Sequence, residues 1–337
     1  MSELSLSFHH LVVPLRAAFT NAATTITERH IGLVELSDGS NTGWGEASPY
    51  PSLDPPIASL IAAAESGRAS PLLHTAVSLA RADLSARQAA QPLGRQFGIE
   101  RTTVPICLAV GHGDMAVEDV KTASSRGVTR FKIKVAPGQV DHVRAIREAF
   151  PDHVIGVDAN GSFDGTTIEQ LLVLREADLA FIEQPCDLTD RALVDRVHAN
   201  IDAPVFADES VRTIADAAAI AATDHIDGLV LKPARLGIVG AVDAARAASH
   251  AGKRWRASGL LESGIGRAYS NLLAAHRDAF VSDVAPADWF LQRDVAAVGV
   301  VDASVEIPAG PGIGLVPDES VLDRFRIGAY DLRNLLN

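Results

Sequence analysis

Five charged residues recur at almost even intervals, and each closes an apolar, strand-like run. The steps between them are 24, 25, 25 and 24 residues. One strand, one helix and their two loops take about that many residues in a (β/α)₈ barrel, where all strands end at the same mouth. The spacing therefore predicts that five successive strands each bring one charge to a single site: Lys134, Asp158, Glu183, Asp208 and Lys232.

The three acids of this set predict a divalent-metal site. Asp158, Glu183 and Asp208 supply carboxylate oxygens without His or Cys, which suits Mg²⁺, with Mn²⁺ as an alternative. Each acid by itself is also compatible with capping the next helix or pairing with a surface lysine. Burying three like charges together is costly without a cation, so the metal site is favoured. Asn160 and Glu209, close to two of these ligands, are expected as auxiliary groups.

The lysines predict proton transfer. Lys132 and Lys134 lie two apart on one strand, so both side chains point into the predicted barrel or both point out of it. The interior is favoured, because Phe131, Ile133 and Val135 then face the helices. Neighbouring ammonium groups lower each other's pKa from about 10.4, so we expect Lys134 to transfer the proton and Lys132 to help electrostatically. Lys232 is expected on the opposite side of the cleft from Lys134. The positive charge of Arg235, three residues later, is expected to lower the pKa of Lys232 by repulsion. A solvated loop arginine is the alternative reading of Arg235.

These charges suit one reaction type. A hydrogen α to a carboxylate is very weakly acidic, and its removal requires strong stabilisation of an enediolate. A divalent metal provides that stabilisation electrostatically, and a lysine takes the proton. The second lysine acts as an acid on the other face or stays a cation beside the intermediate.

The first hundred residues predict a different architecture from the rest. Runs at 4–15, 29–36 and 42–46 are β-prone, and Asp38-Gly39 is a hairpin signal. Together they predict an antiparallel meander. Helical spacing follows at 57–66 and 72–88.

A regular alternation starts at Thr103 and continues to about residue 300, which predicts a parallel sheet closed into a barrel. The tail from 306 returns to turn-rich β character. The predicted fold class is thus α/β, a modified (β/α)₈ barrel at 103–303 with an α+β capping domain made by 1–102 and a C-terminal tail at 304–337. The expected helices of the barrel are 117–125, 140–149, 167–175, 190–198, 214–223 and 238–251, and its late strands are 254–258 and 280–284.

The net charge and the pI limit the classes of molecule that the protein is expected to bind. The chain has 337 residues, a net charge of −12 and a pI near 5.3, which argues against nucleic acid or an anionic membrane. A small anionic carboxylate substrate stays compatible, because a metal and lysines make a cleft positive. The start, Met1 to Ser5, lacks the features of a signal peptide, so we expect a cytoplasmic protein, with a homo-oligomer left open.

The motifs resemble those of the muconate-lactonizing subgroup of the enolase superfamily. Gly43-Trp44-Gly45-Glu46 is similar to the signature of its capping domain. The resemblance implies a cap plus a modified barrel, one Mg²⁺ on the three acids, and catalytic Lys134 and Lys232. The motifs that carry it are Lys132-x-Lys134, Asp158-x-Asn160, Glu183-Gln184-Pro185, Asp208-Glu209-Ser210 and Lys232-Pro233.

Within the subgroup, two segments resemble the o-succinylbenzoate synthase and N-succinylamino acid racemase branch: Lys232-Pro233-Ala234-Arg235, and the run from Leu261 to Ala268 followed by Asp283. The synthase reaction implied is a syn elimination of water in menaquinone synthesis. Lys134 would be base and then acid, and Lys232 would remain a cation. The racemase alternative uses both lysines as opposed bases.

The chain also departs from that branch. It has Gly237-Ile238 where a double glycine is usual, and Ala257-Ser258-Gly259-Leu260 in place of Gly-Gly-Met. Both changes concern substrate contacts and leave the metal and the lysines intact. The expected substrate-binding or auxiliary residues are Ser258, Gly259, Glu262, Asp283 and Arg235, with Arg16 and Phe19 closing from the cap.

Three other functions fit parts of this residue pattern. A dipeptide epimerase usually carries a paired acidic motif in the last barrel loops, whereas Val281-Ser282-Asp283-Val284 offers one acid. A Schiff-base aldolase needs a desolvated lysine but not three metal ligands. A non-catalytic scaffold is expected to have lost at least one of the five charges, and none is missing.

Overall fold

The computed structural model describes residues 4–20, 24–111, 113 and 115–335. Its largest sheet is parallel and contains seven strands in the order β11-β10-β9-β8-β7-β6-β5. Each βα step returns the chain to the same edge, so all seven strands end at one side. The strands are β5 (Leu108–Val110), β6 (Arg130–Lys134), β7 (Val154–Asp158), β8 (Ile182–Glu183), β9 (Val205–Ala207), β10 (Gly228–Leu231) and β11 (Arg254–Ala257).

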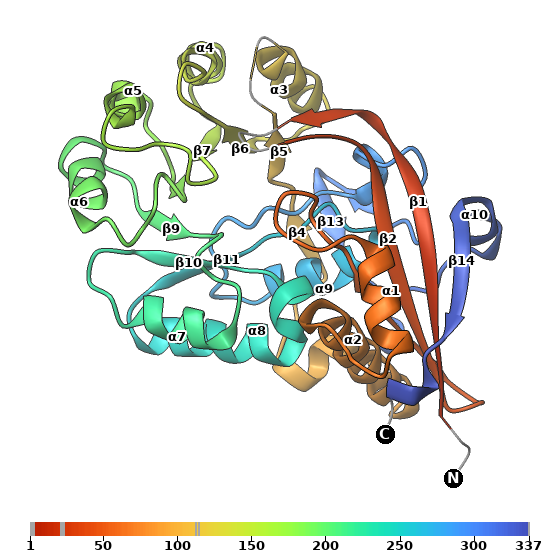
Figure 1. Ribbon diagram of the computed structural model, residues 1–337. Coiled ribbons are helices and arrows are strands. Elements are labelled where there is room, and N and C mark those ends of the chain that lie inside the picture. The colour runs from red at the N-terminus through yellow and green to blue at the C-terminus, as the bar shows by residue number, and fades with distance from the viewer. Residues whose placement is uncertain (1–3, 21–23, 112, 114, 336–337) are drawn as a thin grey trace.

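Helices surround the outer side of this curled sheet (Figure 1). The predicted helices are confirmed, although α5 is short and continues as the 3₁₀ turn η2 (Val173–Glu176). The last of them begins earlier than expected, at Pro233, and Gly237 kinks it with φ 68° and ψ 166°. They are α3 (Ala116–Ser124), α4 (Asp141–Ala149), α5 (Ile168–Leu172), α6 (Arg191–Asn200), α7 (Ile214–Ala221) and α8 (Pro233–His250).

The prediction of an eighth strand at 280–284 is wrong, because this segment does not form a regular strand. It still bridges the two edges of the sheet. The backbone N–H of Phe280 donates to Trp255 O (2.8 Å) in β11, and that of Cys107, just before β5, donates to Val284 O (3.1 Å). A buried helix that the sequence analysis did not predict, α9 (Gly264–Ala274), precedes this segment.

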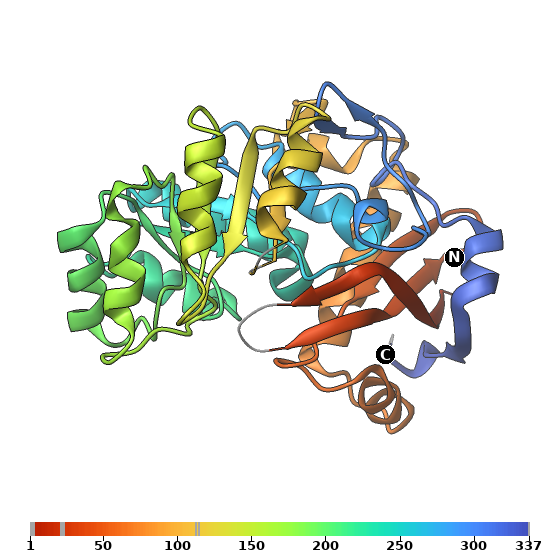
Figure 2. The same cartoon turned by 90° about the horizontal axis from the view of Figure 1, so that it is seen from above.

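A second, antiparallel sheet has the order β14-β1-β2-β3. The predicted meander is confirmed as β1 (Ser5–Thr20), β2 (Thr25–Ser37) and β3 (Thr42–Ala47). The C-terminal β14 (Arg326–Asp331) pairs with β1, so both ends of the described chain share this sheet. The helices α1 (Ile57–Glu65), α2 (Pro71–Gln88) and α10 (Glu319–Phe325) accompany it, and Figure 2 shows it beside the parallel sheet.

The strand-like run at Thr103 does not belong to the parallel sheet, contrary to the expectation that the regular alternation starts there. The strand β4 (Thr103–Pro105) joins a small antiparallel sheet with β13 (Ser304–Glu306) and β12 (Val300–Val301). The first parallel strand is β5. Three further 3₁₀ turns are η1 (Leu93–Phe97), η3 (Ala287–Trp289) and η4 (Arg333–Leu335).

Buried polar contacts join the antiparallel sheet to the segment that follows the parallel sheet. Glu46 accepts backbone N–H bonds from Ser263 (3.0 Å) and Gly266 (2.9 Å) at the start of α9, where a carboxylate also suits the helix dipole. Arg29 donates to the carbonyl oxygens of Leu260 (3.0 Å) and Leu261 (3.2 Å). These bonds fix the segment that follows β11. In the described ranges, every helix is too short or too polar to cross a lipid bilayer.

Gly45→Ala is expected to lower the free energy of unfolding by roughly 1–3 kcal/mol, because β3 lies directly on α2. A Cβ at Gly45 would lie 2.0 Å from the carbonyl oxygen of Ala76. Urea unfolding followed by circular dichroism measures the change. Gly165→Ala is the control, since a Cβ there meets nothing within 4 Å. Equal stability of the two variants would contradict this packing.

Candidate active site and metal centre

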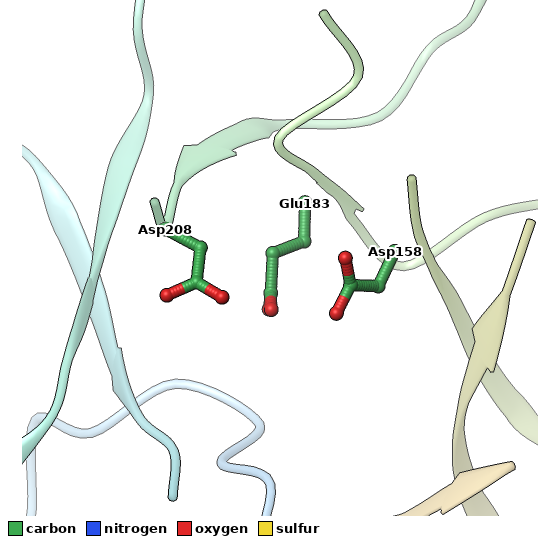
Figure 3. Close-up of side chains that lie close together, drawn as sticks. All are labelled: Asp158, Glu183 and Asp208. Atoms are coloured by element: carbon green, nitrogen blue, oxygen red, sulfur yellow. The ribbon is translucent and has the colours of Figure 1, made fainter. Parts of the chain in front are cut away.

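Three carboxylates converge at the mouth of the parallel sheet. Asp158 ends β7, Glu183 ends β8 and Asp208 follows β9, so neighbouring strands deliver them side by side (Figure 3). All three are buried, and one ligand atom from each lies within 4.8 Å of the others. The convergence predicted from the spacing is thus present in the structure.

A lysine flanks each outer member of this trio. Lys134 Nζ, at the end of β6, donates to Asp158 Oδ2 (2.6 Å). Lys232 Nζ, just after β10, donates to Asp208 Oδ1 (2.6 Å). The strand order β10-β9-β8-β7-β6 therefore produces a row of lysine, aspartate, glutamate, aspartate and lysine across the mouth.

Lys132 lies inside the sheet, as predicted, and contacts three carboxylates. Its Nζ is 3.0 Å from Asp158 Oδ2, 2.8 Å from Glu183 Oε1 and 2.9 Å from Asp283 Oδ2. Burial alone would lower the pKa of Lys132, but these carboxylates outweigh burial and raise it well above its ordinary value. The expected lowering of the Lys132 pKa by the neighbouring ammonium is therefore wrong.

The carboxylates respond differently to the same surroundings. Burial opposes ionisation of Asp158, but Lys132 and Lys134 overcome this and hold its pKa well below the usual range. For Glu183, burial dominates and raises the pKa. Burial, with the charge of Asp208, also raises the pKa of Glu209.

The loops after the ligand strands are held in unusual backbone conformations. Asn160 has φ 47° and Gln184 has φ 40°, both in the left-handed region that non-glycine residues rarely adopt. Asn160 Oδ1 accepts a bond from Lys134 Nζ (3.0 Å), and its Nδ2 donates to Glu209 Oε1 (2.8 Å). Gln184 Oε1 accepts the backbone N–H of Asp208 (2.9 Å). These amides tie the ends of adjacent strands together.

A cavity of about 600 Å³ opens in front of the carboxylates. Arg16 and Phe19 of β1 line it, together with Tyr50 and Leu53 from the segment after β3. The structure thus brings the two predicted cap residues to the same space as the barrel charges. The predicted site residues on the cavity wall are Lys132, Lys134, Asn160, Asp208, Glu209, Lys232, Gly259, Asp283, Arg16 and Phe19.

Two further predicted residues lie behind this wall. Ser258 Oγ donates to Asp283 Oδ2 (3.0 Å), which leaves Asp283 shared between Ser258 and Lys132. Glu262 is fully buried, and its nearest cation is Arg267, whose Nε is 3.7 Å from Glu262 Oε2. Ser258 and Glu262 are therefore placed to support the wall of the cavity.

Arg235 has a different role from the one expected. Its Nη2 donates to Asp54 Oδ2 (2.7 Å), and Nη1 bonds to Oδ1 of the same carboxylate. This two-point ion pair joins the start of α8 to the segment before α1. The negative charges of Asp208 and Glu209 outweigh burial and raise the pKa of Lys232. The expected lowering of the Lys232 pKa by Arg235 is therefore also wrong.

Sequence reasoning missed Arg256, which donates from Nη1 to Glu183 Oε2 (2.6 Å) and is fully buried. Arg256 stands two residues before Ser258 on β11, so strand alternation places both on the same face. That alternation is the signal by which Arg256 could be found.

The donor set fits a divalent cation. The trio offers oxygens only, as Mg²⁺ and Mn²⁺ prefer. Buried like charges at this spacing repel strongly unless cations compensate them, and Lys132, Lys134 and Lys232 contact them in the structure. Asp158, Glu183 and Asp208 are therefore the residues that would hold the ion.

A family model described as "Enolase C-terminal domain-like" matches residues 115–321. This range includes the trio and all three lysines. The chain belongs to the enolase superfamily.

Individual relatives share its whole length. An N-succinylamino acid racemase from Amycolatopsis is 29% identical over 96% of this chain and 97% of its own. An o-succinylbenzoate synthase from Bacillus subtilis is 25% identical over 95% of each. A muconate lactonizing enzyme from Pseudomonas fluorescens has the same fold, with a TM-score of 0.86, 23% identity and coverage of 96% and 99%. The resemblance read from the motifs is thereby confirmed.

Asp208→Asn is expected to raise the Mg²⁺ dissociation constant roughly tenfold or more, because ligand charge sets the affinity of a hard cation. Isothermal titration of the EDTA-treated, desalted protein measures it. Asp224→Asn is the control, since Asp224 is a surface carboxylate, 74% exposed, that pairs with Arg191. An unchanged Mg²⁺ affinity in Asp208→Asn would remove Asp208 from the ligand set.

Proposed function

We propose that the protein is a Mg²⁺-dependent lyase of the o-succinylbenzoate synthase type. It removes a proton α to a substrate carboxylate, forms an enediolate and eliminates water on the same face. The observation that carries the proposal is the row across the sheet mouth, in which Lys134 and Lys232 flank the carboxylate trio from opposite ends.

The two lysines have the positions that the reaction needs. Both line the same cavity, so a substrate held in front of the trio lies between them. In the proposed elimination, Lys134 takes the α-proton and returns it to the departing hydroxyl group. Lys232 stays charged, which its raised pKa favours, and stabilises the negative charge that develops opposite.

A divalent ion on Asp158, Glu183 and Asp208 would supply positive charge where the substrate carboxylate gains electron density. The remaining residues of the site orient and support. Asn160 holds Lys134 and Glu209 in place through its two amide atoms. Lys132 fixes Asp158, Glu183 and Asp283, and the cap residues Arg16 and Phe19 limit the entry of water.

Racemisation of an N-succinylamino acid is the second candidate, and the same row of residues favours it. A lysine on either side of an α-carbon allows removal of a proton from one face and its return on the other. Two relatives that match 96% and 95% of the chain carry these two different names. Dipeptide epimerisation is a third reaction that the same groups could support. It is favoured less, because Asp283 is the one acid of the segment 281–284, where a dipeptide epimerase usually carries a pair.

We further propose that the curled sheet and the bridging segment 280–284 act as one closed barrel under a cap built from both ends of the chain. The domain limits 1–102, 103–303 and 304–337 stay predictions. The proposed partner is a small anionic carboxylate, with neither nucleic acid nor membrane involved. A cytoplasmic location, a place in menaquinone synthesis and a possible homo-oligomer also belong to the proposal.

Lys134→Ala is expected to reduce turnover by roughly 10²–10⁴-fold, because it deletes the group that transfers the proton. The assay follows formation of o-succinylbenzoate from its hydroxycyclohexadiene carboxylate precursor, with N-succinylamino acids tested in parallel. Lys121→Ala is the control, since Lys121 is a surface lysine of α3 that pairs with Glu118. Substantial residual activity in folded Lys134→Ala would remove Lys134 from its role.

Lys232→Arg separates the two candidate reactions. Arginine preserves the charge but is too weak an acid to exchange protons. Racemisation is therefore expected to fall by a much larger factor than elimination, measured as conversion of one N-succinylamino acid enantiomer into the other and as formation of o-succinylbenzoate. Equal losses in both assays would contradict the purely electrostatic role of Lys232 in elimination.

A further inference from the structure

Arg256 is a buried cation whose hydrogen bond, among the described residues, goes to a metal-ligand candidate. It stands on β11, inside the parallel sheet, and is 0% exposed. Its Nη1 donates to Glu183 Oε2 (2.6 Å). Its Nε and Nη2 are buried without a hydrogen-bond partner among the residues that the structure describes. A buried charge with so few polar contacts is costly, so the Glu183 contact is the main compensation for that cost.

The guanidinium of Arg256 lies over the aromatic ring of Phe181. The Arg256 Cζ lies 3.8 Å from the centroid of the Phe181 ring, within the range of a cation–π contact. Phe181 is two residues before Glu183, so the ring and the carboxylate come from one short segment. Gly156 makes room for this ring, since a Cβ there would lie 2.2 Å from Phe181 Cζ. This packing restrains the orientation of the Arg256 guanidinium group relative to the Glu183 carboxylate.

Both oxygens of Glu183 are then held by cations. Lys132 reaches Oε1 (2.8 Å) from one side, and Arg256 reaches Oε2 (2.6 Å) from the other. Asp158 is restrained differently, by Lys132 and Lys134, and Asp208 by Lys232. Glu183 has the longest side chain of the trio and hence the most rotamer freedom to lose. Arg256 is the only group on its Oε2 among the described residues.

We infer that Arg256 is a positioning residue of the metal centre, which fixes the orientation of the Glu183 carboxylate toward the ion. The inference rests on the proposed Mg²⁺ site. Groups that orient metal ligands typically contribute about 10- to 100-fold to metal affinity. A positive charge that merely lies near the ion has the opposite effect, because it repels the ion.

These opposite signs make the role testable by Mg²⁺ titration of the EDTA-treated, full-length protein. Arg256→Met is expected to raise the Mg²⁺ dissociation constant about 10- to 100-fold. Arg256→Lys keeps the charge but loses the planar group over Phe181, and is expected to weaken Mg²⁺ several-fold. The Mn²⁺ electron paramagnetic resonance spectrum of both variants is expected to differ from that of the unmodified protein.

Arg254→Met is the matched control. Arg254 lies on the same strand, is exposed, and has its own ring contact, 5.4 Å from the Phe280 centroid. Its Mg²⁺ affinity is expected to stay within twofold of the unmodified protein.

The outcomes separate this inference from the proposed function. Tighter or equal Mg²⁺ binding in Arg256→Met, or unchanged binding in Arg256→Lys, overturns the positioning role and leaves the proposed reaction standing. If Arg256→Met does not fold, Arg256→Lys decides by the same titration. If the unmodified protein binds no Mg²⁺, the metal centre and the proposed function fail, and the inference with them.

Discussion

The repulsion among three buried carboxylates is the constraint around which the site is arranged. Asp158, Glu183 and Asp208 lie within reach of one ion, and such a group is unstable without positive charge beside it. The structure supplies that charge from within the same sheet, through the three lysines and Arg256. Removal of any one partner leaves an uncompensated charge, so the residues of the mouth act as a unit.

The parallel sheet makes this arrangement possible because it repeats one geometry. Each strand ends at the same side, and neighbouring strands are about 4.8 Å apart, so side chains from adjacent strand ends can reach one ion. The backbone has to turn sharply after the ligands, and Asn160 and Gln184 do so in the left-handed region. Their amides then bond the adjacent loops, so the same residues that strain the backbone also hold the site together.

The cavity is lined by residues of both the antiparallel and the parallel sheet. Arg29 and Glu46 bind the segment after β11, and Asp54 holds Arg235 at the start of α8. These contacts cross between parts of the chain that are about 200 residues apart or more, and they bring Arg16 and Phe19 to the charges of the mouth. Substrate selection is therefore expected to depend on both sheets, whereas the proposed proton transfer is expected to depend on the parallel sheet alone.

The sequence by itself determined the alternation of strands and helices, the three converging carboxylates and the flanking lysines, because a βα unit has a nearly constant length and a strand has a period of two. It did not determine the irregular segment 280–284, the membership of β4 in a separate sheet, or the direction of the Lys132 pKa shift. Those depend on which groups meet across the fold. The pairs Arg256–Glu183 and Arg235–Asp54 were likewise decided only by the tertiary structure, since charge compensation acts through space and leaves no fixed spacing along the chain.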